Sequence, residues 1–161
     1  MAGSAAFDER SVGEHLDDVA IAAQIKTRMI AEKDFPSRWI SVEVSRGDVA
    51  LTGYLPRQNQ IERAIIICRS FKGVKTVNSE IKLGKPSTNS LFSDTLITAK
   101  VKTKLLDDPM TSGFSVHVET VDGVVYLQGV VENDEQLYRA KDVALSVGGV
   151  VAVDNKLRIG H

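Results

Sequence analysis

Three lysines at alternate positions, Lys100, Lys102 and Lys104, lie within the apolar stretch DTLITAKVKTKLLDD of residues 94–108. Ammonium groups beside apolar side chains can bind an anionic phospholipid surface, because the charges attract the headgroups while the apolar groups enter the acyl layer. The same pattern is also typical of an ordinary helix that has one buried face and one solvated face. From these residues alone, both interpretations stay open.

The other reactive residues do not indicate catalysis or metal binding. The histidines, His15, His117 and His161, lack the spacing of a metal site, and we expect His117 to be a solvated strand residue. The single cysteine, Cys68, excludes an intramolecular disulfide and a cysteine-based zinc site, and it fits the apolar stripe of a helix as an inert core thiol. Acidic clusters at 17–18, 107–108 and 132–135 suit helix ends and loops, and nothing pairs them for catalysis. We therefore predict no enzyme activity, no metal and no cofactor.

The composition limits the classes of partner. The chain has 161 residues and a formal net charge of −1, so no chain-wide field attracts nucleic acid, and none is expected as a partner. Its longest apolar run, AIIIC, is far shorter than a transmembrane helix requires. The first residues, MAGSAAFDER, lack the basic start and apolar core of a signal peptide. They fit either a cytoplasmic start or a start downstream of a removed export signal.

The strongest pattern is an internal repeat at an offset of 76 residues, which runs without a gap from residues 18–83 to residues 94–159. DVAIAAQIKTRM aligns with DTLITAKVKTKL, GDVALTG with GVVYLQG, QIERA with QLYRA and SFKGVKTV with SVGGVVAV. A register this long indicates a duplicated domain.

Each copy predicts the same order of elements. A helix starts near Asp18 or at Ser93–Asp94, and an alternating strand leads to a hairpin turn at Arg46–Gly47 or Asp122–Gly123. A second strand, a second helix and a third strand follow. The second helices are predicted over residues 58–71 and 134–147, and the single tryptophan, Trp39, is expected to begin a strand.

These elements predict an α+β fold of two tandem α-β-β-α-β modules. Each module has a three-stranded mixed sheet with both helices on one face, because the β-α-β crossover is right-handed and makes its two strands parallel. We expect a flexible arm over residues 1–16, modules over 17–83 and 94–161, and a polar linker over 84–93. Since a module this small has a thin core, the two copies are expected to pack on each other.

The motifs G-x-V-x-L-x-G in the hairpin and G-V-x-x-V after the second helix resemble those of BON domains, a module of bacterial osmotic-stress and envelope proteins. The resemblance covers residues 18–159. The lead-in DERSVGEHLDD and the stretch SDTLITAKVKTKLL are similar to those of a subgroup of lipid-binding outer-membrane lipoproteins. This similarity implies a non-enzymatic periplasmic protein anchored in the outer membrane, whose signal and lipidated cysteine are absent from this chain.

In that subgroup the first helix of the second domain contacts anionic phospholipid of the phosphatidylglycerol type. The matching residues here are Thr95, Leu96, Ile97, Lys100, Val101 and Lys104. The subgroup carries a tryptophan where this chain has Leu96, so the apolar insertion is kept but the interfacial preference of the indole ring is lost.

A helical wheel with about 100° per residue gives this helix two faces. Ile97, Val101 and Leu105 form the core face, and Lys102 points to the far side. Leu96, Lys100 and Thr103 share the remaining flank, with Lys104 at its edge and Phe92 beside it if the helix reaches back that far, whereas Thr95 is a candidate through the resemblance. The candidate lipid-binding residues are therefore Phe92, Thr95, Leu96, Lys100, Thr103 and Lys104. We predict a protein that binds anionic phospholipid and supports outer-membrane integrity, with room for envelope protein partners. The alternative is a soluble periplasmic osmotic-stress protein, acting through protein contacts or as a chaperone, without lipid specificity.

Overall fold

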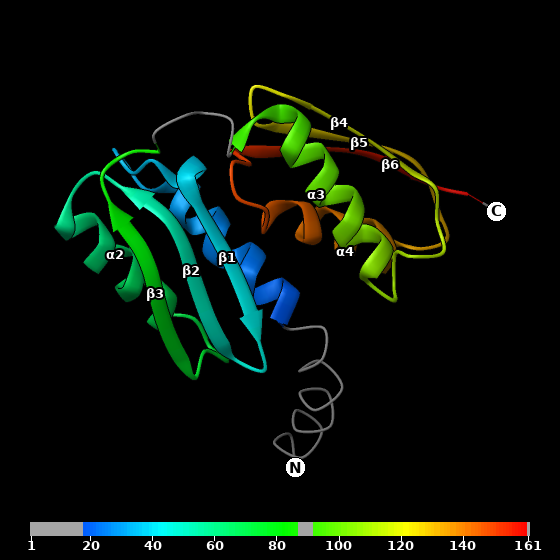
Figure 1. Cartoon of the computed structure of the whole chain (residues 1–161). Helices are drawn as coiled ribbons and strands as arrows, with labels where there is room; N and C mark the ends of the chain where they lie inside the picture. The colour runs from blue at the N-terminus through cyan, green and yellow to red at the C-terminus, as the bar shows by residue number, and fades with distance from the viewer. Residues whose placement is uncertain (1–17, 87–91, 161) are drawn as a thin grey trace, which may run out of the picture.

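The computed structural model describes residues 18–86 and 92–160. The predicted arm over residues 1–16 and half of the predicted linker, residues 87–91, lie outside these residues, as do His15 and His161. The described part confirms the predicted fold class. It contains two α+β modules, each with a three-stranded mixed sheet (Figure 1).

The elements follow the predicted order in both modules. The first module consists of a helix over residues 18–31, η1 (Ser37–Trp39), β1 (Ile40–Ser45), β2 (Asp48–Leu55), α2 (Gln58–Arg69) and β3 (Thr76–Leu83). The second consists of α3 (Asp94–Asp107), β4 (Val116–Val121), β5 (Val124–Val131), α4 (Asp134–Leu145) and β6 (Ala152–Ile159).

The sheet topology is the same in both modules. The strand orders are β1-β2-β3 and β4-β5-β6, with an antiparallel hairpin and then a parallel pair. The predicted hairpin turns are confirmed, because Arg46 and Asp122 have φ of 53° and 50° and are each followed by a glycine with positive φ. Two consecutive residues with positive φ match the twist of a tight hairpin.

Three predicted boundaries are wrong by one or two residues. The second helices end at Arg69 and Leu145, because the chain tightens into a turn at the following serine before it reaches Gly73 or Gly149, which have positive φ. Trp39 does not begin a strand. It ends the short helix η1, and β1 starts at Ile40.

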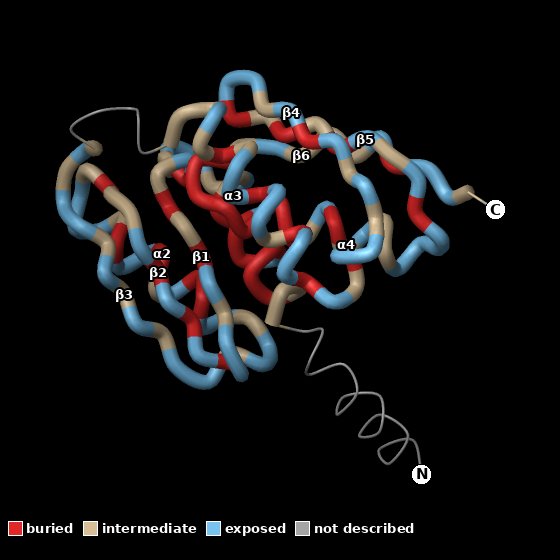
Figure 2. The backbone as a smooth tube through the Cα atoms, turned by 45° about the vertical axis from the view of Figure 1, so that its right-hand side comes forward, coloured by how far each residue is buried: buried red, intermediate tan, exposed pale blue. Residues whose placement is uncertain are grey.

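Each module has its own apolar core between its sheet and its two helices (Figure 2). The stripe Ile21, Ile25 and Met29 is buried in the first core, and Ile97, Val101 and Leu105 are buried in the second. Alternate strand residues such as Leu51 and Leu127 complete these cores from the sheet side. The predicted core faces of the first helices are therefore confirmed.

Aspartates at the start of the first helices hold the hairpins in place. The Asp18 carboxylate accepts hydrogen bonds from the backbone N–H groups of Arg46, at 2.7 Å, and Gly47, at 3.2 Å. Asp94 binds the N–H groups of the second hairpin turn in the same way, at 2.7 and 2.9 Å. Ser93 is the N-cap of α3 as predicted, since its hydroxyl accepts from Leu96 N at 3.2 Å.

Candidate functional site at the junction of the two modules

The two modules contact each other through different surfaces. The first contributes its first helix and the edge strand β1, and the second contributes α3 and the turn after α4, residues 145–150, which we call the α4 turn. Leu145 is the last residue of α4, residues 146–150 follow it, and all six residues of the α4 turn are buried. A Cβ placed on Gly148 would lie 3.2 Å from Ser41 Cβ, so the turn passes close against β1. The expectation that the copies pack on each other is confirmed (Figure 1).

Lys26 lies at the centre of this junction. Its side chain is fully buried, and its Nζ donates to the carbonyl oxygen of Ile40 at 2.5 Å and to that of Val147 at 3.3 Å. Burial lowers the pKa of Lys26 to about 7. Hydrogen bonds to carbonyls favour an ammonium, but a neutral amine also has two N–H donors, so it satisfies both acceptors without a buried charge.

The candidate helix α3 divides as the wheel predicts. Ile97 and Val101 are buried in the core, so the lipid contact that the resemblance implies for these two residues is wrong. Lys102 is exposed. Thr95, Lys100 and Thr103 are also exposed, and Leu96 is half-buried. Thr95 lies on the side of α3 that faces β4, apart from Lys100 and Thr103, which line a groove beside β1.

The other two candidate residues are engaged with the rest of the chain. Lys104 Nζ lies 3.0 Å from Glu43 Oε1 on β1, and this ion pair joins the modules. Phe92 is half-buried, and its ring lies against the α4 turn, where a Cβ on Gly148 would come within 3.2 Å of Phe92 Cε1. The predicted flank is therefore partly at the junction and partly open to solvent.

A groove of about 370 Å³ runs along this flank. It is lined by Ser41, Glu43, Ala99, Lys100, Thr103, Lys104, Val147 and Gly148. Two ammonium groups and one carboxylate line it, and Lys100 has no ion pair or hydrogen bond within residues 18–86 and 92–160. The groove can offer the Lys100 ammonium and the Thr103 hydroxyl to an anionic headgroup, although that hydroxyl also donates to Ala99 O at 3.0 Å.

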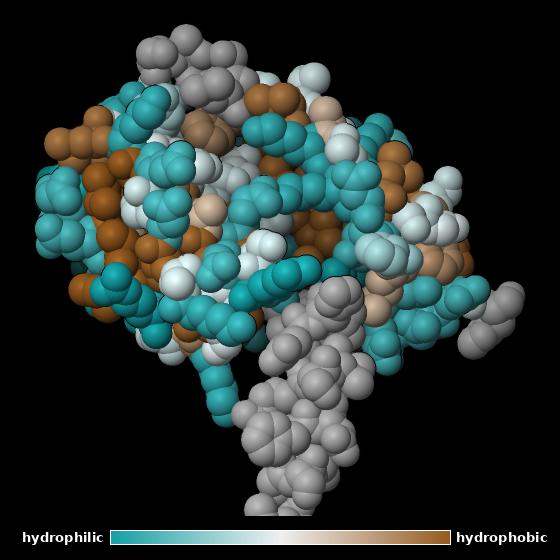
Figure 3. Space-filling model, turned by 60° about the horizontal axis from the view of Figure 1, so that its bottom comes forward, coloured by the Kyte–Doolittle hydropathy of each residue, from teal (hydrophilic) through white to brown (hydrophobic). Residues whose placement is uncertain are grey.

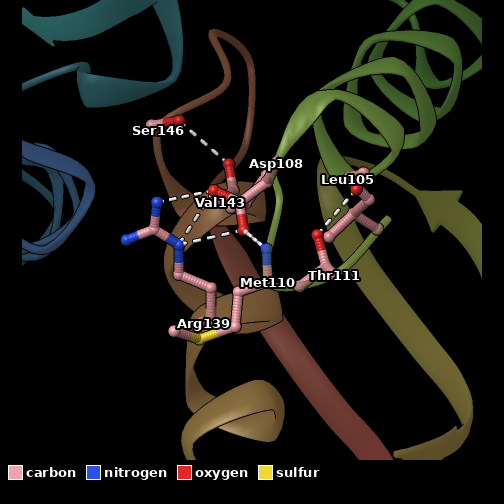
Figure 4. Close-up of polar contacts among 7 residues, drawn as sticks. All are labelled: Leu105, Asp108, Met110, Thr111, Arg139, Val143 and Ser146. Carbon is pink, nitrogen blue, oxygen red and sulfur yellow. Dashed lines mark hydrogen bonds and ion pairs between the residues drawn. The ribbon is translucent and has the colours of Figure 1, made fainter. Parts of the chain in front are cut away.

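A buried ion pair supports the end of α3 that carries Lys104. Arg139 of α4 binds Asp108 with its Nε at 3.0 and 3.1 Å from the two carboxylate oxygens and a terminal nitrogen at 2.5 Å (Figure 4). Asp108 also accepts from Met110 N at 3.2 Å, and Thr111 Oγ1 donates to Leu105 O at 2.6 Å. These contacts fix the turn that follows α3.

The first module repeats this pair at the positions 76 residues earlier. Arg63 Nε lies 2.7 Å from Glu32 Oε1, and Arg28 also binds this carboxylate. The Arg63 guanidinium, followed by that of Arg28, lowers the pKa of Glu32. Neither pair was predicted from the sequence. The sequence signal for them is that both aligned copies carry an acidic residue, Glu32 or Asp108, and an arginine, Arg63 or Arg139, at equivalent positions.

Cys68 and His117 lie as predicted from the sequence. Cys68 is buried, and burial raises the pKa of its thiol to about 12, which makes it an inert core residue. His117 is an exposed strand residue. In residues 18–86 and 92–160 no cluster of metal-ligating side chains is found, and no helix within those ranges has the length and apolarity needed to cross a bilayer.

The chain is similar to known bacterial proteins. It is 35% identical to osmotically-inducible protein Y of Escherichia coli over 150 residues, which cover 91% of this chain and 75% of that protein. It is 27% identical to outer membrane lipoprotein DolP of Haemophilus influenzae, over 95% of this chain and 80% of that protein. A solved structure of the C-terminal domain of CdsD, from the type III secretion system of Chlamydia trachomatis, is matched with a TM-score of 0.37 and 17% identity, over 86% of this chain and 64% of that one.

The family is given by a direct match to both repeats. The model of the BON domain matches residues 17–85 and again residues 93–161, so it covers most of the chain. The chain belongs to the BON-domain family, as a tandem pair.

Proposed function

We propose that this protein is a non-enzymatic envelope protein that binds anionic phospholipid through the exposed flank of α3 and supports outer-membrane integrity. The observation that carries this proposal is the exposed Lys100, which lies beside Thr103 and the half-buried Leu96 on the flank that faces away from the core. The similarity to an outer membrane lipoprotein supports a place at that membrane, in the periplasm.

The free energy of this contact is small. A lysine near an anionic surface contributes ~1 kcal/mol, and one inserted leucine contributes ~1.5–3 kcal/mol. Because Lys104 is paired with Glu43, Lys100 provides most of the electrostatic attraction. A site of this strength retains the protein at a membrane only when a second attachment, such as an acyl anchor, adds to it.

We expect the protein to bind vesicles that contain phosphatidylglycerol more strongly than vesicles of phosphatidylcholine alone. The Lys100→Glu variant should bind the anionic vesicles about thirtyfold more weakly, because the change removes one attraction of ~1 kcal/mol and adds a repulsion of similar size. Leu96→Asp should weaken binding by a similar factor through the lost apolar insertion. Co-sedimentation with vesicles at low salt measures both effects.

Lys102→Glu is the matched control for this experiment. Lys102 is exposed on the same helix but on a different flank, and its reversal changes the net charge by the same amount. Its vesicle binding should stay close to that of the unmodified chain. Equal loss in the Lys100 and Lys102 variants, or equal binding to both kinds of vesicle, would reject the α3 site. Circular dichroism melts show whether each variant is folded.

The second candidate function is a soluble periplasmic osmotic-stress protein without lipid specificity. It is favoured by the 35% identity to an osmotically-inducible protein and by the ion pair that occupies Lys104. Under this alternative the flank of α3 mainly holds the modules together. Absence of binding to both kinds of vesicle would favour it.

A further inference from the structure

A cleft of about 730 Å³ lies at the end of the first module from which the chain leaves toward α3 (Figure 1). We call it the Trp39 cleft. It is formed by the loop after the first helix, by η1, by the connection from β2 to α2 and by the segment after β3, and its lining includes Phe35, Pro36, Trp39, Pro56, Arg57 and Lys85. A smaller cavity of about 280 Å³ adjoins it, because the two have lining residues such as Phe35 and Arg57 in common.

The apolar walls of the Trp39 cleft are rings. Phe35 packs against the core of the first module, whereas Trp39 is half-buried and does not belong to that core. Pro36 and Pro56 complete the walls. Single hydrophobic residues among hydrophilic ones, as on the face shown in Figure 3, are ordinary on a protein surface. Rings gathered around one recess instead favour a ligand that has flat ring faces of its own.

Hydrogen bonds within the first module hold the frame of the cleft. Gln60 Nε2 donates to Asp34 O at 3.1 Å, and Gln60 Oε1 accepts from Arg57 N at 3.1 Å. The carboxylate of Glu32, which also lines the cleft, lies 2.7 Å from Arg63 Nε. These groups are used by the protein itself, and they shape the recess before any ligand enters.

Other polar groups of the cleft are unused. Within residues 18–86 and 92–160, the indole N–H of Trp39 and the cations of Arg57 and Lys85 donate to no protein acceptor. In the same ranges the Asp34 carboxylate accepts from no donor. Since the Glu32 carboxylate is already paired, the free charges are two cations and one carboxylate. The excess of one positive charge favours a ligand with an anionic group.

The second module keeps the frame of this cleft but not its walls. The frame positions carry residues of the same chemistry: Asp108, Gln136 and Arg139. The wall and cation positions carry small or polar residues, with Thr111, Ser115, Glu132 and Asn133 in place of Phe35, Trp39, Pro56 and Arg57. Because both modules have the same fold, the fold requires the frame and not the rings. The rings of the first module are therefore available for recognition.

We propose that the Trp39 cleft binds an oligosaccharide that carries a carboxylate. The flat C–H face of a pyranose ring packs on the indole ring, while sugar hydroxyls donate to the Asp34 carboxylate and accept from the indole N–H. The Arg57 guanidinium binds the sugar carboxylate through two parallel hydrogen bonds, and Lys85 adds a second cation. This site lies in the first module, so it does not depend on lipid binding by α3.

Two other occupants fit the cleft less well. An anionic bilayer is repelled by the Asp34 carboxylate, and half-buried rings that line a recess cannot insert into it. An acidic proline-rich peptide also stacks on aromatic rings. Its acidic residues, however, are repelled by Asp34, and it lacks the hydroxyl donors that this carboxylate accepts. Removal of the Asp34 charge should therefore strengthen peptide binding and weaken sugar binding.

The fluorescence of Trp39 tests the proposal directly, because Trp39 is the single tryptophan of the chain. Titration with the disaccharide of N-acetylglucosamine and N-acetylmuramic acid should change its emission in a saturable way. Diacetylchitobiose, which lacks only the lactyl group with its carboxylate, is the matched neutral probe and should bind about tenfold more weakly. Arg57→Gln should raise the dissociation constant of the acidic disaccharide about tenfold and leave that of the neutral one nearly unchanged.

Two further variants separate this site from other causes. Lys75→Gln removes one positive charge at an exposed position at the other end of β3, and it should bind both sugars like the unmodified chain. Asp34→Asn keeps the loop, because asparagine also adopts the φ of 57° that Asp34 has. It should weaken the binding of both sugars by a similar factor. Circular dichroism shows whether each variant is folded.

Several results would overturn the proposal. One is the absence of a saturable change in Trp39 emission with the acidic disaccharide, and another is equal binding of the two disaccharides. An equal loss in the Lys75→Gln and Arg57→Gln variants would do the same. An acidic proline-rich peptide is titrated in parallel. If this peptide binds while the disaccharides do not, and binds more tightly to Asp34→Asn, the cleft is a peptide site instead.

Discussion

Raising the pH from 7 to 9 is expected to increase the free energy of unfolding by about 2 kcal/mol through Lys26 alone. In the folded chain the pKa of this buried lysine is lowered to about 7, whereas in the unfolded chain it has its ordinary value of 10.5. Between these two pKa values the unfolded chain binds a proton that the folded chain does not bind. Stability therefore rises with pH through this window and is lower at and below pH 7.

Urea denaturation of the unmodified chain and of two methionine variants measures this effect. Lys26→Met keeps the length of the side chain but cannot titrate, so its stability should change little between pH 7 and 9. Lys102→Met is the matched control, because Lys102 holds the equivalent position in the second module and is exposed. This control should keep the full pH dependence. If the stability of Lys26→Met changes with pH as much as that of the unmodified chain, Lys26 is not the group responsible for the pH dependence.

The second large effect is expected at the ion pair of Asp108 and Arg139. Both side chains are nearly buried, with 8% and 11% of their surfaces exposed, and the guanidinium contacts both carboxylate oxygens. Arg139→Met should lower the free energy of unfolding by about 3–5 kcal/mol, because it leaves a buried carboxylate without its cation. Urea denaturation at pH 7 measures this loss of stability.

The duplication supplies the control for this prediction. Arg63→Met removes the equivalent arginine of the first module, whose side chain is 44% exposed and whose partner, Glu32, keeps Arg28. The destabilisation should therefore be clearly smaller than for Arg139→Met. Equal losses at the two positions would show that burial does not determine the strength of the pair.

The fold could be predicted from the sequence because the repeat reports each element twice. A helical stripe such as Ile97, Val101 and Leu105 is supported by its partner stripe 76 residues earlier, and the turn at Asp122–Gly123 by the one at Arg46–Gly47. Boundaries were less certain because a helix end depends on one or two backbone hydrogen bonds, which leave little trace in periodicity.

The junction could not be predicted in the same way, because it breaks the symmetry of the repeat. Lys26 and Lys102 are the same residue type at equivalent positions, yet one is fully buried and the other is exposed. Nothing in either helix distinguishes them. The difference comes from the α4 turn, more than a hundred residues further along the chain from Lys26. For the same reason, the partner that β1 provides for Lys104 was not foreseen.

The junction also has a consequence for the time course of folding. Lys26 and Val147 are 121 residues apart in the chain, so the first module is synthesised well before the turn that covers it. At bacterial translation rates this delay is on the order of 10 s. During that time the backbone of the edge strand β1 is open to pairing with other chains. Translation therefore produces a first module whose strand edge is at risk of aggregation until the second module has folded against it.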